Sequence, residues 1–307
     1  MKNHSYAFVG LGHLGSNLAG SLLREGFDVT VFDRDPNAVS RLVERGAKAA
    51  GSAADAARAA GNAITCLPSP VISELVLSGP GGLLEGLPAG GTWIEMSTNG
   101  RDEILRFESM AKAKGVHTLE CPVTGGVHLA ASGNITALVG GDKALYDAHL
   151  PAISAMTGQS FHMGGIGSAA VIKVITNMLA FVHLVAAGEA MMLAKKGGLD
   201  LAQAYQAIVA SSGNSFVHET ETQLVLSGTY NIGFTMDLAL KDLGFALGMG
   251  KEYGVPLDLA SIVAQTFVRG KTAYGGGAWS TQVVKLLEDV TNTPLRADGF
   301  PDTLEPA

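Results

Sequence analysis

The feature that most constrains this chain is a glycine-spaced segment near its start, Gly10-Leu11-Gly12-His13-Leu14-Gly15. It lies directly after an apolar run at residues 6–9 and directly before a helical pattern that begins at residue 17. The first glycine of such a segment permits a tight turn, the second lets the backbone approach a phosphate, and the third lets the helix pack on the strand. The helix N-terminus adds unpaired N–H groups and the positive end of a dipole. We therefore predict a strand–turn–helix unit in which residues 10–15 bind the pyrophosphate of a dinucleotide.

The first half of the chain alternates short apolar runs with helical patterns, which is typical of a parallel sheet with crossover helices. Strands are predicted at residues 6–9, 29–32, 63–67, 92–95, 117–120 and 136–139. Helices are predicted between them at 17–25, 36–45, 53–60, 71–77 and 102–114. This order predicts a doubly wound α/β domain of the Rossmann type.

After the glycine cluster at residues 164–167 the apolar patterns are helical. Helices are predicted at 168–196, 201–210, 236–253, 257–270 and 280–290, and the proline-containing end, 291–307, is expected to be an extended tail. Ser168 is a suitable N-cap for the first of these helices, and Gly197-Gly198 is a suitable stop. We place the boundary near Gly165. The expected organisation is a Rossmann domain at 1–164 and an all-helical substrate and dimerisation domain at 165–307.

An acidic and a basic residue follow the second predicted strand and bear on the choice of cofactor. The Asp33 carboxylate can accept hydrogen bonds from the ribose hydroxyls of NAD, whereas Arg34 could meet the 2′-phosphate of NADP. We predict NAD, with NADP as the open alternative. Open α/β sheets bind ligands at the carboxyl ends of their strands. The residues at the ends of the third and fourth strands are therefore assigned to the same cofactor site: Leu67, Pro68, Ser97 and Thr98.

Composition narrows the classes of function. An apolar content of 47% and a charged content of 16% are typical of a globular chain with a sizeable core. The formal charge of −7 and the lack of a long basic run argue against a nucleic-acid partner. Cys66, Cys121 and the scattered histidines lack the spacing of metal ligands, so no metal site is predicted.

The chain is expected to be cytoplasmic, with no membrane partner. Its N-terminus is short and polar before the first strand, which leaves no room for a signal peptide. The most apolar stretch, residues 169–194, is interrupted by Lys173, Asn177, His183 and Glu189. A membrane span rarely tolerates that many polar groups, so we interpret the stretch as a long helix buried in protein.

Lys173 and Asn177 lie four residues apart in that helix, so their side chains share one face. Apolar residues surround them on nearly every side. A buried ammonium group is costly unless it has a partner or a chemical task, and burial favours the neutral amine, which can accept a proton. The residues alone leave two interpretations open: a catalytic lysine, or a lysine whose ammonium group reaches the surface from the helix start.

Four segments together resemble the β-hydroxyacid dehydrogenase family, which includes 3-hydroxyisobutyrate dehydrogenases and tartronate semialdehyde reductases and is related to 6-phosphogluconate dehydrogenase. Residues 8–19 are similar to the family's cofactor signature. Residues 120–126 read Glu-Cys-Pro-Val-Thr-Gly-Gly and resemble its substrate motif, usually Asp-Ala-Pro-Val-Ser-Gly-Gly. Residues 167–177 resemble the catalytic helix, and residues 241–243, Lys-Asp-Leu, resemble a later signature. The segments follow the family's order over almost the whole chain.

The resemblance implies an acid–base function for the helix. Lys173 is expected to protonate the developing alkoxide during carbonyl reduction and to remove the hydroxyl proton during oxidation. Asn177 is expected to orient Lys173 or a substrate hydroxyl. Lys241 is expected to act at the nicotinamide end of the site and to help close the cleft.

The resemblance also implies a small carboxylate-bearing substrate. Thr124, with the backbone N–H groups of Gly125 and Gly126, is expected to hold the carboxylate, because an anion can approach glycine backbone closely. Three departures from the family pattern bear on the identity of the substrate: Thr124 replaces a serine, Ala169 a second glycine and Thr176 an additional asparagine. The implied reaction is therefore a class, hydride transfer between NAD(P) and a small β-hydroxy acid or its semialdehyde, rather than one substrate.

Two other functions stay open. An imine reductase-like enzyme would share the architecture but usually lacks the lysine, and a nicotinamide-binding regulatory protein would keep the fold without catalysis. The assembly is predicted separately. One small helical domain can hardly cover every face of the helix at 168–196, so we expect a homodimer or homotetramer.

Overall fold

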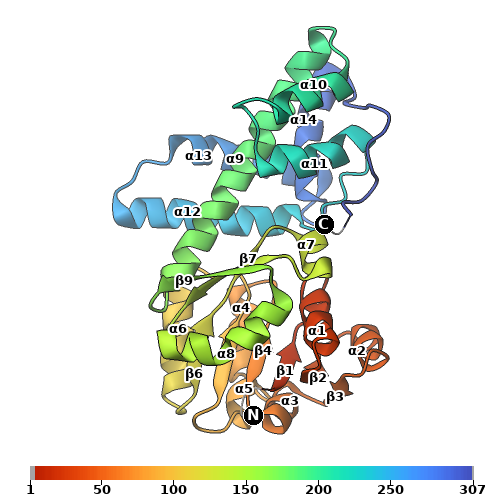
Figure 1. The fold of residues 1–307 in the computed structure, drawn as a ribbon. Helices are drawn as coiled ribbons and strands as arrows, with labels where there is room; N and C mark the ends of the chain where they lie inside the picture. Colours follow the sequence, from red (N-terminus) through yellow and green to blue (C-terminus); the bar gives the residue numbers. More distant parts are fainter. Residues whose placement is uncertain (1–3, 306–307) are drawn as a thin grey trace. The chain divides into compact units, whose positions relative to one another are not determined.

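The computed structural model describes residues 4–305, and the chain divides into two compact units (Figure 1). Unit 1 runs through Lys173, and unit 2 covers Val174–Glu305. The helix α9 (Ser168–Lys196) is continuous and contributes residues to both units. Each unit has hydrophobic cores of its own.

Unit 1 is built on a nine-stranded sheet in which six neighbouring strands are parallel. In spatial order these are β3 (Lys48–Ala49), β2 (Asp28–Phe32), β1 (Ser5–Val9), β4 (Ala63–Thr65), β5 (Thr92–Glu95) and β6 (His117–Glu120). Next to β6 comes the antiparallel β8 (Thr136–Gly140), which pairs with β7 (Val123–Thr124) and β9 (Gln159–Gly164). The strand order reverses at β1, which is where open sheets bind ligands. The predicted doubly wound fold is confirmed.

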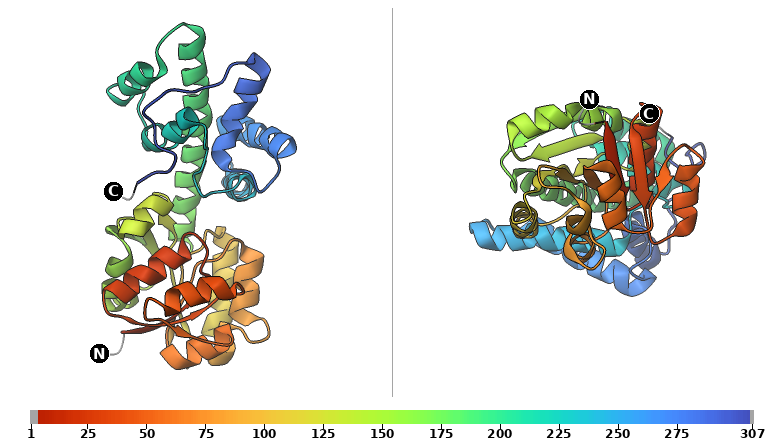
Figure 2. Two further views of the ribbon diagram at one scale, coloured as in Figure 1. Left: turned by 90° about the vertical axis from the view of Figure 1, so that its right-hand side faces the viewer. Right: turned by 90° about the horizontal axis from the view of Figure 1, so that it is seen from below.

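Helices cover both faces of this sheet (Figure 2). One face carries α1 (Gly15–Arg24), α2 (Pro36–Val43), the short α7 (Val127–Ser132) and α8 (Lys143–Met156). The other carries α3 (Ala53–Ala60), α4 (Pro70–Ser78), α5 (Leu83–Gly86) and α6 (Arg101–Lys112).

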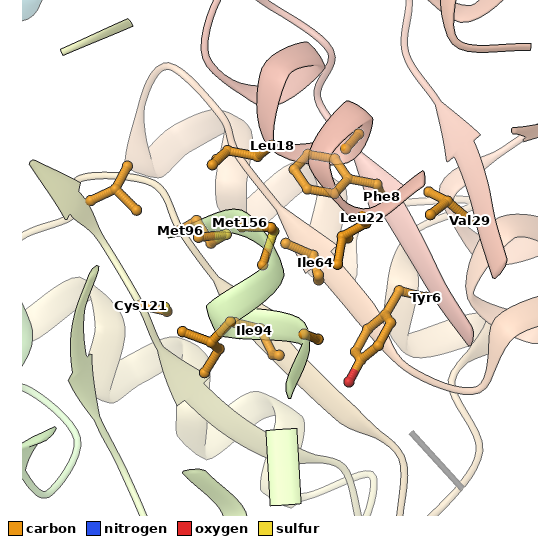
Figure 3. Packing of buried hydrophobic residues seen from close by; sticks show 14 of the residues in the cluster. Tyr6, Phe8, Leu18, Leu22, Val29, Ile64, Ile94, Met96, Cys121 and Met156 are labelled. Atoms are coloured by element: carbon orange, nitrogen blue, oxygen red, sulfur yellow. The ribbon is translucent and has the colours of Figure 1, made fainter. Parts of the chain in front are cut away.

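The strand β1 shows how the sequence specifies these two layers. Tyr6 and Phe8 pack with Leu18 and Leu22 of α1 in one core (Figure 3), while the intervening residues 7 and 9 lie in the core on the other face. This alternation is the two-residue period of a strand. Because both faces are covered, the strand reads in the sequence as a continuous apolar run.

Unit 2 is helical, which confirms the predicted all-helical second half. Besides α9 it contains α10 (Leu201–Val209), α11 (Phe216–Ser227), α12 (Met236–Tyr253), α13 (Asp258–Tyr274), the 3-10 helix η1 (Ser280–Val284) and α14 (Lys285–Thr291). Phe181 of α9, Met236 of α12 and Phe267 of α13 meet in its core. After α14, residues 292–305 form no helix or strand, whereas an extended tail was predicted. The buried Glu288 carboxylate anchors this segment by accepting bonds from the Leu295 N–H and the Arg296 guanidinium, both at 2.7 Å.

Within residues 4–305, α9 is the one helix long and apolar enough to cross a membrane by length and composition alone. The core helix of a soluble protein passes the same test. Lys173, near the start of α9, is 6% exposed and so is buried within the protein itself.

Several elements depart from the sequence predictions. Periodicity did not predict the helices α5, α7, α8 and α11, the two-residue strands β3 and β7, or the six-residue strand β9. The strands form through pairing with distant residues, and α8 contains Pro151, which reads locally as a helix breaker. The prediction of a single helix at 280–290 was wrong, because this segment forms the 3-10 helix η1 followed by the α-helix α14. There the Ser280 N–H donates to the Phe234 carbonyl at 2.8 Å, a tertiary bond that no local pattern encodes.

Three buried side chains are linked by successive hydrogen bonds across the core of unit 1. The Tyr6 hydroxyl bonds Nδ1 of His149 at 2.8 Å, and Nε2 of the same ring bonds the Thr92 hydroxyl at 3.0 Å. Burial lowers the pKa of His149 from 6.5 to about 4, with a smaller contribution from His117. The folded protein therefore holds this imidazole neutral at pH values where the unfolded chain protonates it.

We predict that His149 makes unit 1 sensitive to mild acid. Its folded pKa is depressed, so its contribution to stability is complete above pH 6.5 and is lost as the pH falls towards 4, at about 1.4 kcal/mol per unit of pKa difference. Urea unfolding of a Trp279→Phe background, read from the fluorescence of buried Trp93, should show this loss. In His149→Gln, which keeps an acceptor and a donor but does not titrate, the loss should be smaller. If the free energy of unfolding fell equally with pH in the proteins with and without His149→Gln, the prediction would be contradicted.

Candidate active site

The glycine segment forms the turn between β1 and α1 that its spacing predicts. Gly10 has φ of +97°, and a Cβ there would lie 2.3 Å from the Cys66 carbonyl oxygen. A Cβ on Gly15 would lie 2.0 Å from the Gly10 carbonyl oxygen. At Gly12, in contrast, a Cβ would have no protein atom within 4 Å, and the residue is exposed. Two glycines thus shape the turn and the third leaves space, which fits the approach of a pyrophosphate.

The other residues of the turn divide between core and solvent. Leu11 is buried, Leu14 packs against the core of unit 1, and His13 is exposed beside Gly12. The apolar residues anchor the turn, while the exposed backbone at 12–13 leads into the N-terminus of α1. The turn therefore offers its backbone, rather than its side chains, to a ligand.

Asp33, just after β2, is joined to this turn. Its Oδ2 accepts a hydrogen bond from the Leu11 N–H at 2.6 Å, and its Oδ1 accepts one from the Asp35 N–H at 2.8 Å. A carboxylate has about four acceptor positions, so capacity remains for ribose hydroxyls. Arg34 is exposed next to it. The arrangement fits the adenosine end of a nicotinamide dinucleotide.

The residues that follow β4 and β5 also come together. The Leu67 N–H donates to the Ser97 hydroxyl at 2.7 Å, and the Ser97 N–H donates to Oε1 of buried Glu95 at 2.7 Å. Pro68 is exposed and Thr98 is half-buried beside them. Because β1, β2, β4 and β5 are parallel, all the residues predicted to bind the cofactor in unit 1 lie at one edge of the sheet.

The segment expected to hold a carboxylate leaves β7 with an unusual backbone. Thr124 pairs with Thr136 of β8 and is half-buried. Gly125 and Gly126 have φ of +124° and +94°, values that strongly favour glycine. Backbone of this kind is accessible to glycine and lets a ligand approach the N–H groups closely, as the predicted carboxylate-binding role needs.

The start of α9 is held by a carboxylate that the sequence did not indicate. Oε1 of Glu120, the last residue of β6, accepts bonds from the N–H groups of Gly167 at 2.5 Å and Ala169 at 2.9 Å. Its Oε2 accepts one from Ala170 at 3.0 Å. The expected cap, Ser168, instead donates its hydroxyl to the Gly165 carbonyl at 2.6 Å, so that prediction was wrong. Burial raises the pKa of Glu120, and the three N–H donors oppose that shift.

In unit 2, Asn177 and Lys241 meet at one buried aspartate. The Asn177 amide donates to Oδ2 of Asp242 at 2.6 Å, and the Lys241 ammonium lies 3.1 Å from Oδ1. Asp242 is fully buried, so both partners help to compensate its charge. The structure thereby links the Lys-Asp-Leu signature to α9.

Two family models match consecutive parts of the chain. The NAD binding domain of 6-phosphogluconate dehydrogenase matches residues 5–165, and the NAD-binding domain of NADP-dependent 3-hydroxyisobutyrate dehydrogenase matches residues 167–287. The chain is 33% identical to 2-(hydroxymethyl)glutarate dehydrogenase of Eubacterium barkeri over 96% of this chain and 98% of that one. It is also 33% identical to 3-hydroxyisobutyrate dehydrogenase of Pseudomonas aeruginosa, over 85% of this chain and 90% of that one.

A solved structure supports the same grouping. The crystal structure of 3-hydroxyisobutyrate dehydrogenase from Salmonella typhimurium matches with a TM-score of 0.85 at 29% identity, covering 92% of this chain and 99% of that one. The fold and the matches define an NAD(P)-dependent hydroxyacid dehydrogenase. The chain belongs to the β-hydroxyacid dehydrogenase family.

Sequence reasoning missed the buried acidic and amide side chains that support the site. Glu95, Asn99 and Glu120 line a small cavity of about 10 Å³ together with Ser97 and Ala170. Both amide atoms of Asn99 are buried there without a hydrogen-bond partner among the described residues. A space of this size with several polar partners suits one water molecule. The available signal was the position of Glu95 and Glu120 at the last residue of a buried strand.

We predict that Gly10 and Gly12 respond differently to alanine. Gly10→Ala should lower the melting temperature, because the added methyl group meets the Cys66 carbonyl and the backbone is left-handed. Gly12→Ala should melt like the wild type but bind NADH roughly tenfold more weakly, a loss of about 1.4 kcal/mol, because the methyl group fills the space left for the pyrophosphate. Calorimetry and a fluorescence titration measure the two effects. Unchanged NADH affinity in Gly12→Ala would place the pyrophosphate elsewhere.

Proposed function

We propose that this dehydrogenase interconverts a small β-hydroxy acid and its semialdehyde, with Lys173 as the general acid and base. The observation that carries the proposal is a lysine only 6% exposed, one turn beyond the start of α9 that Glu120 holds. A buried ammonium group needs a function or a partner to offset its desolvation. When bound, the nicotinamide ring accepts or supplies the hydride.

The remaining chemistry is a proton transfer at the substrate oxygen. In oxidation, neutral Lys173 takes the hydroxyl proton as the carbonyl forms; in reduction, the ammonium group returns it to the developing alkoxide. Asn177 is proposed to orient the lysine or the hydroxyl, and its own amide is fixed by Asp242. Lys241, paired with the same aspartate, is proposed to act at the nicotinamide end.

The carboxylate of the substrate is assigned to the segment after β7. Thr124 offers a hydroxyl, and Gly125 and Gly126 offer N–H groups on left-handed backbone. This set of donors favours a small anionic substrate. An imine reductase-like activity is the second candidate, and Lys173 disfavours it. The joint presence of Lys173, Asn177 and the segment at 124–126 disfavours a purely regulatory role.

Replacing Lys173 tests the proposed function. Lys173→Ala should lose roughly 10² to 10⁴ in turnover, the range for general acid–base catalysis, with little change in NADH affinity. Lys173→Arg should fail almost as badly, because a guanidinium keeps its proton. In the oxidative direction the wild-type rate should rise with pH as the lysine becomes neutral. Substrates are first identified by a spectrophotometric screen of small hydroxy acids and semialdehydes with NAD(H) and NADP(H). If Lys173→Ala then kept most of its turnover, the mechanism would be wrong.

The cofactor preference is proposed to follow Asp33. Its carboxylate repels a 2′-phosphate, so catalytic efficiency with NAD(H) should exceed that with NADP(H). Asp33→Asn, which keeps the acceptor for the Leu11 N–H, should lower the ratio of catalytic efficiency with NAD(H) to that with NADP(H). Arg34→Ala should raise the same ratio. A wild-type ratio that favours NADP(H) tenfold would assign the dominant role to Arg34.

We also propose that the protein works in the cytosol as a homodimer or homotetramer. Apolar side chains remain uncovered on unit 2: Leu193 of α9 is 76% exposed, and Ile262 of α13 is 64% exposed. Packing against a second copy of the chain would remove these side chains from water. Light scattering at micromolar concentration should therefore give at least twice the chain mass of 31.6 kDa. A monomer mass would refute the assembly.

A further inference from the structure

The first turn of α9 depends on a carboxylate from a distant strand. A helix leaves its first four N–H groups without partners inside the helix. The nearest candidate cap, the Ser168 side chain, donates its hydroxyl to the Gly165 carbonyl instead. Glu120, 47 residues earlier than Gly167, accepts three bonds at this helix start with its two oxygens. Strand β8 leaves room for it, because a Cβ on Gly140 would lie 2.1 Å from Oε1.

We infer that Glu120 is a positioning residue for Lys173, fixing the helix turn from which the lysine side chain projects. The inference rests on the proposed role of Lys173. Lys173 lies three residues after Ala170, which is a rise of about 4.5 Å along the helix axis. Side chains on a helix tilt towards its N-terminus, so the lysine is directed back over the turn that Glu120 holds. A shift of about 1 Å in a catalytic group can cost roughly 10²-fold in rate.

The charge of Glu120 has a second consequence for the lysine. Glu120 is 1% exposed, and burying a carboxylate carries a large desolvation cost that a neutral acceptor would avoid. A helix N-terminus alone favours loss of a proton from a nearby ammonium group, and a negative charge at that terminus opposes the loss. The other charged groups of unit 1 at this helix start are Glu95, in the same cavity, and Arg101, which lies over Gly167.

Glu120→Gln tests the inference, because glutamine keeps the size and one acceptor but removes the charge and the second acceptor. We expect turnover to fall roughly tenfold or more with the KM for NAD unchanged. The rise of the oxidative rate with pH should move to lower pH, because the ammonium group loses its proton more easily. Aspartate is the usual residue of the family motif, but in this chain all three bonds to the helix start are made by the longer glutamate. Glu120→Asp keeps the charge on a shorter side chain, so it should lower turnover here while leaving the pH profile in place. Ser168→Ala is the matched control at the same helix start and should behave as the wild type.

The outcomes separate this inference from the proposed function. If folded Glu120→Gln matches the wild type in turnover and pH profile, the inference is overturned. If Glu120→Gln does not fold, Glu120→Asp decides: reduced turnover with an unmoved pH profile supports the inference, and wild-type turnover or a moved profile overturns it. The proposed function fails only if Lys173→Ala remains active. Loss of activity in Lys173→Ala with an intact Glu120→Gln therefore rejects the positioning role alone.

Discussion

The parallel register of β2, β1, β4, β5 and β6 is the constraint on which the rest of unit 1 depends. It brings the carboxyl ends of these strands to the same side of the sheet. The loops that follow β1, β2, β4 and β5, which carry the predicted cofactor residues, all leave from that side. The register is specified by side chains that alternate between two cores, Tyr6 and Phe8 on one face and the residues between them on the other. A one-residue slip would exchange Tyr6 and Phe8 with the smaller residues between them, so that neither core would be packed correctly. The packing of the two cores thus determines the geometry of the turn at residues 10–15.

The local parts of the fold and site could be predicted from the sequence. The glycine segment, Asp33 and the span of α9 follow from short-range rules about turns, strand ends and helical periodicity. The two glycines after Thr124 adopt positive φ values, while the role of that segment in binding a carboxylate stays a prediction. Those rules act within a few residues, and that is the distance over which the predictions were accurate.

The rest could not be predicted because it depends on partners far apart in the chain. Glu120 meets Gly167 across 47 residues, and Asn177 meets Asp242 across 65. A carboxylate at a strand end reads locally as a solvent-facing residue, and only the folded chain shows that it is buried. The same holds for β7 and β9, which exist through pairing with β8, and for α8, whose internal proline argues against a helix.

The continuity of α9 limits how far this protein can be treated as a set of interchangeable modules. A cut at the expected boundary, between residues 164 and 165, would fall within two residues of Gly167 and would separate Glu120 from the N–H groups it binds. The compact units instead divide inside the helix, just after Lys173. A chimera that exchanged the helical half of one relative for that of another would keep Lys173, the proposed acid–base residue, with its own sheet only if the junction lay in the body of the helix. When this enzyme is recombined with a relative, the suitable junction is therefore a turn inside α9 rather than a loop.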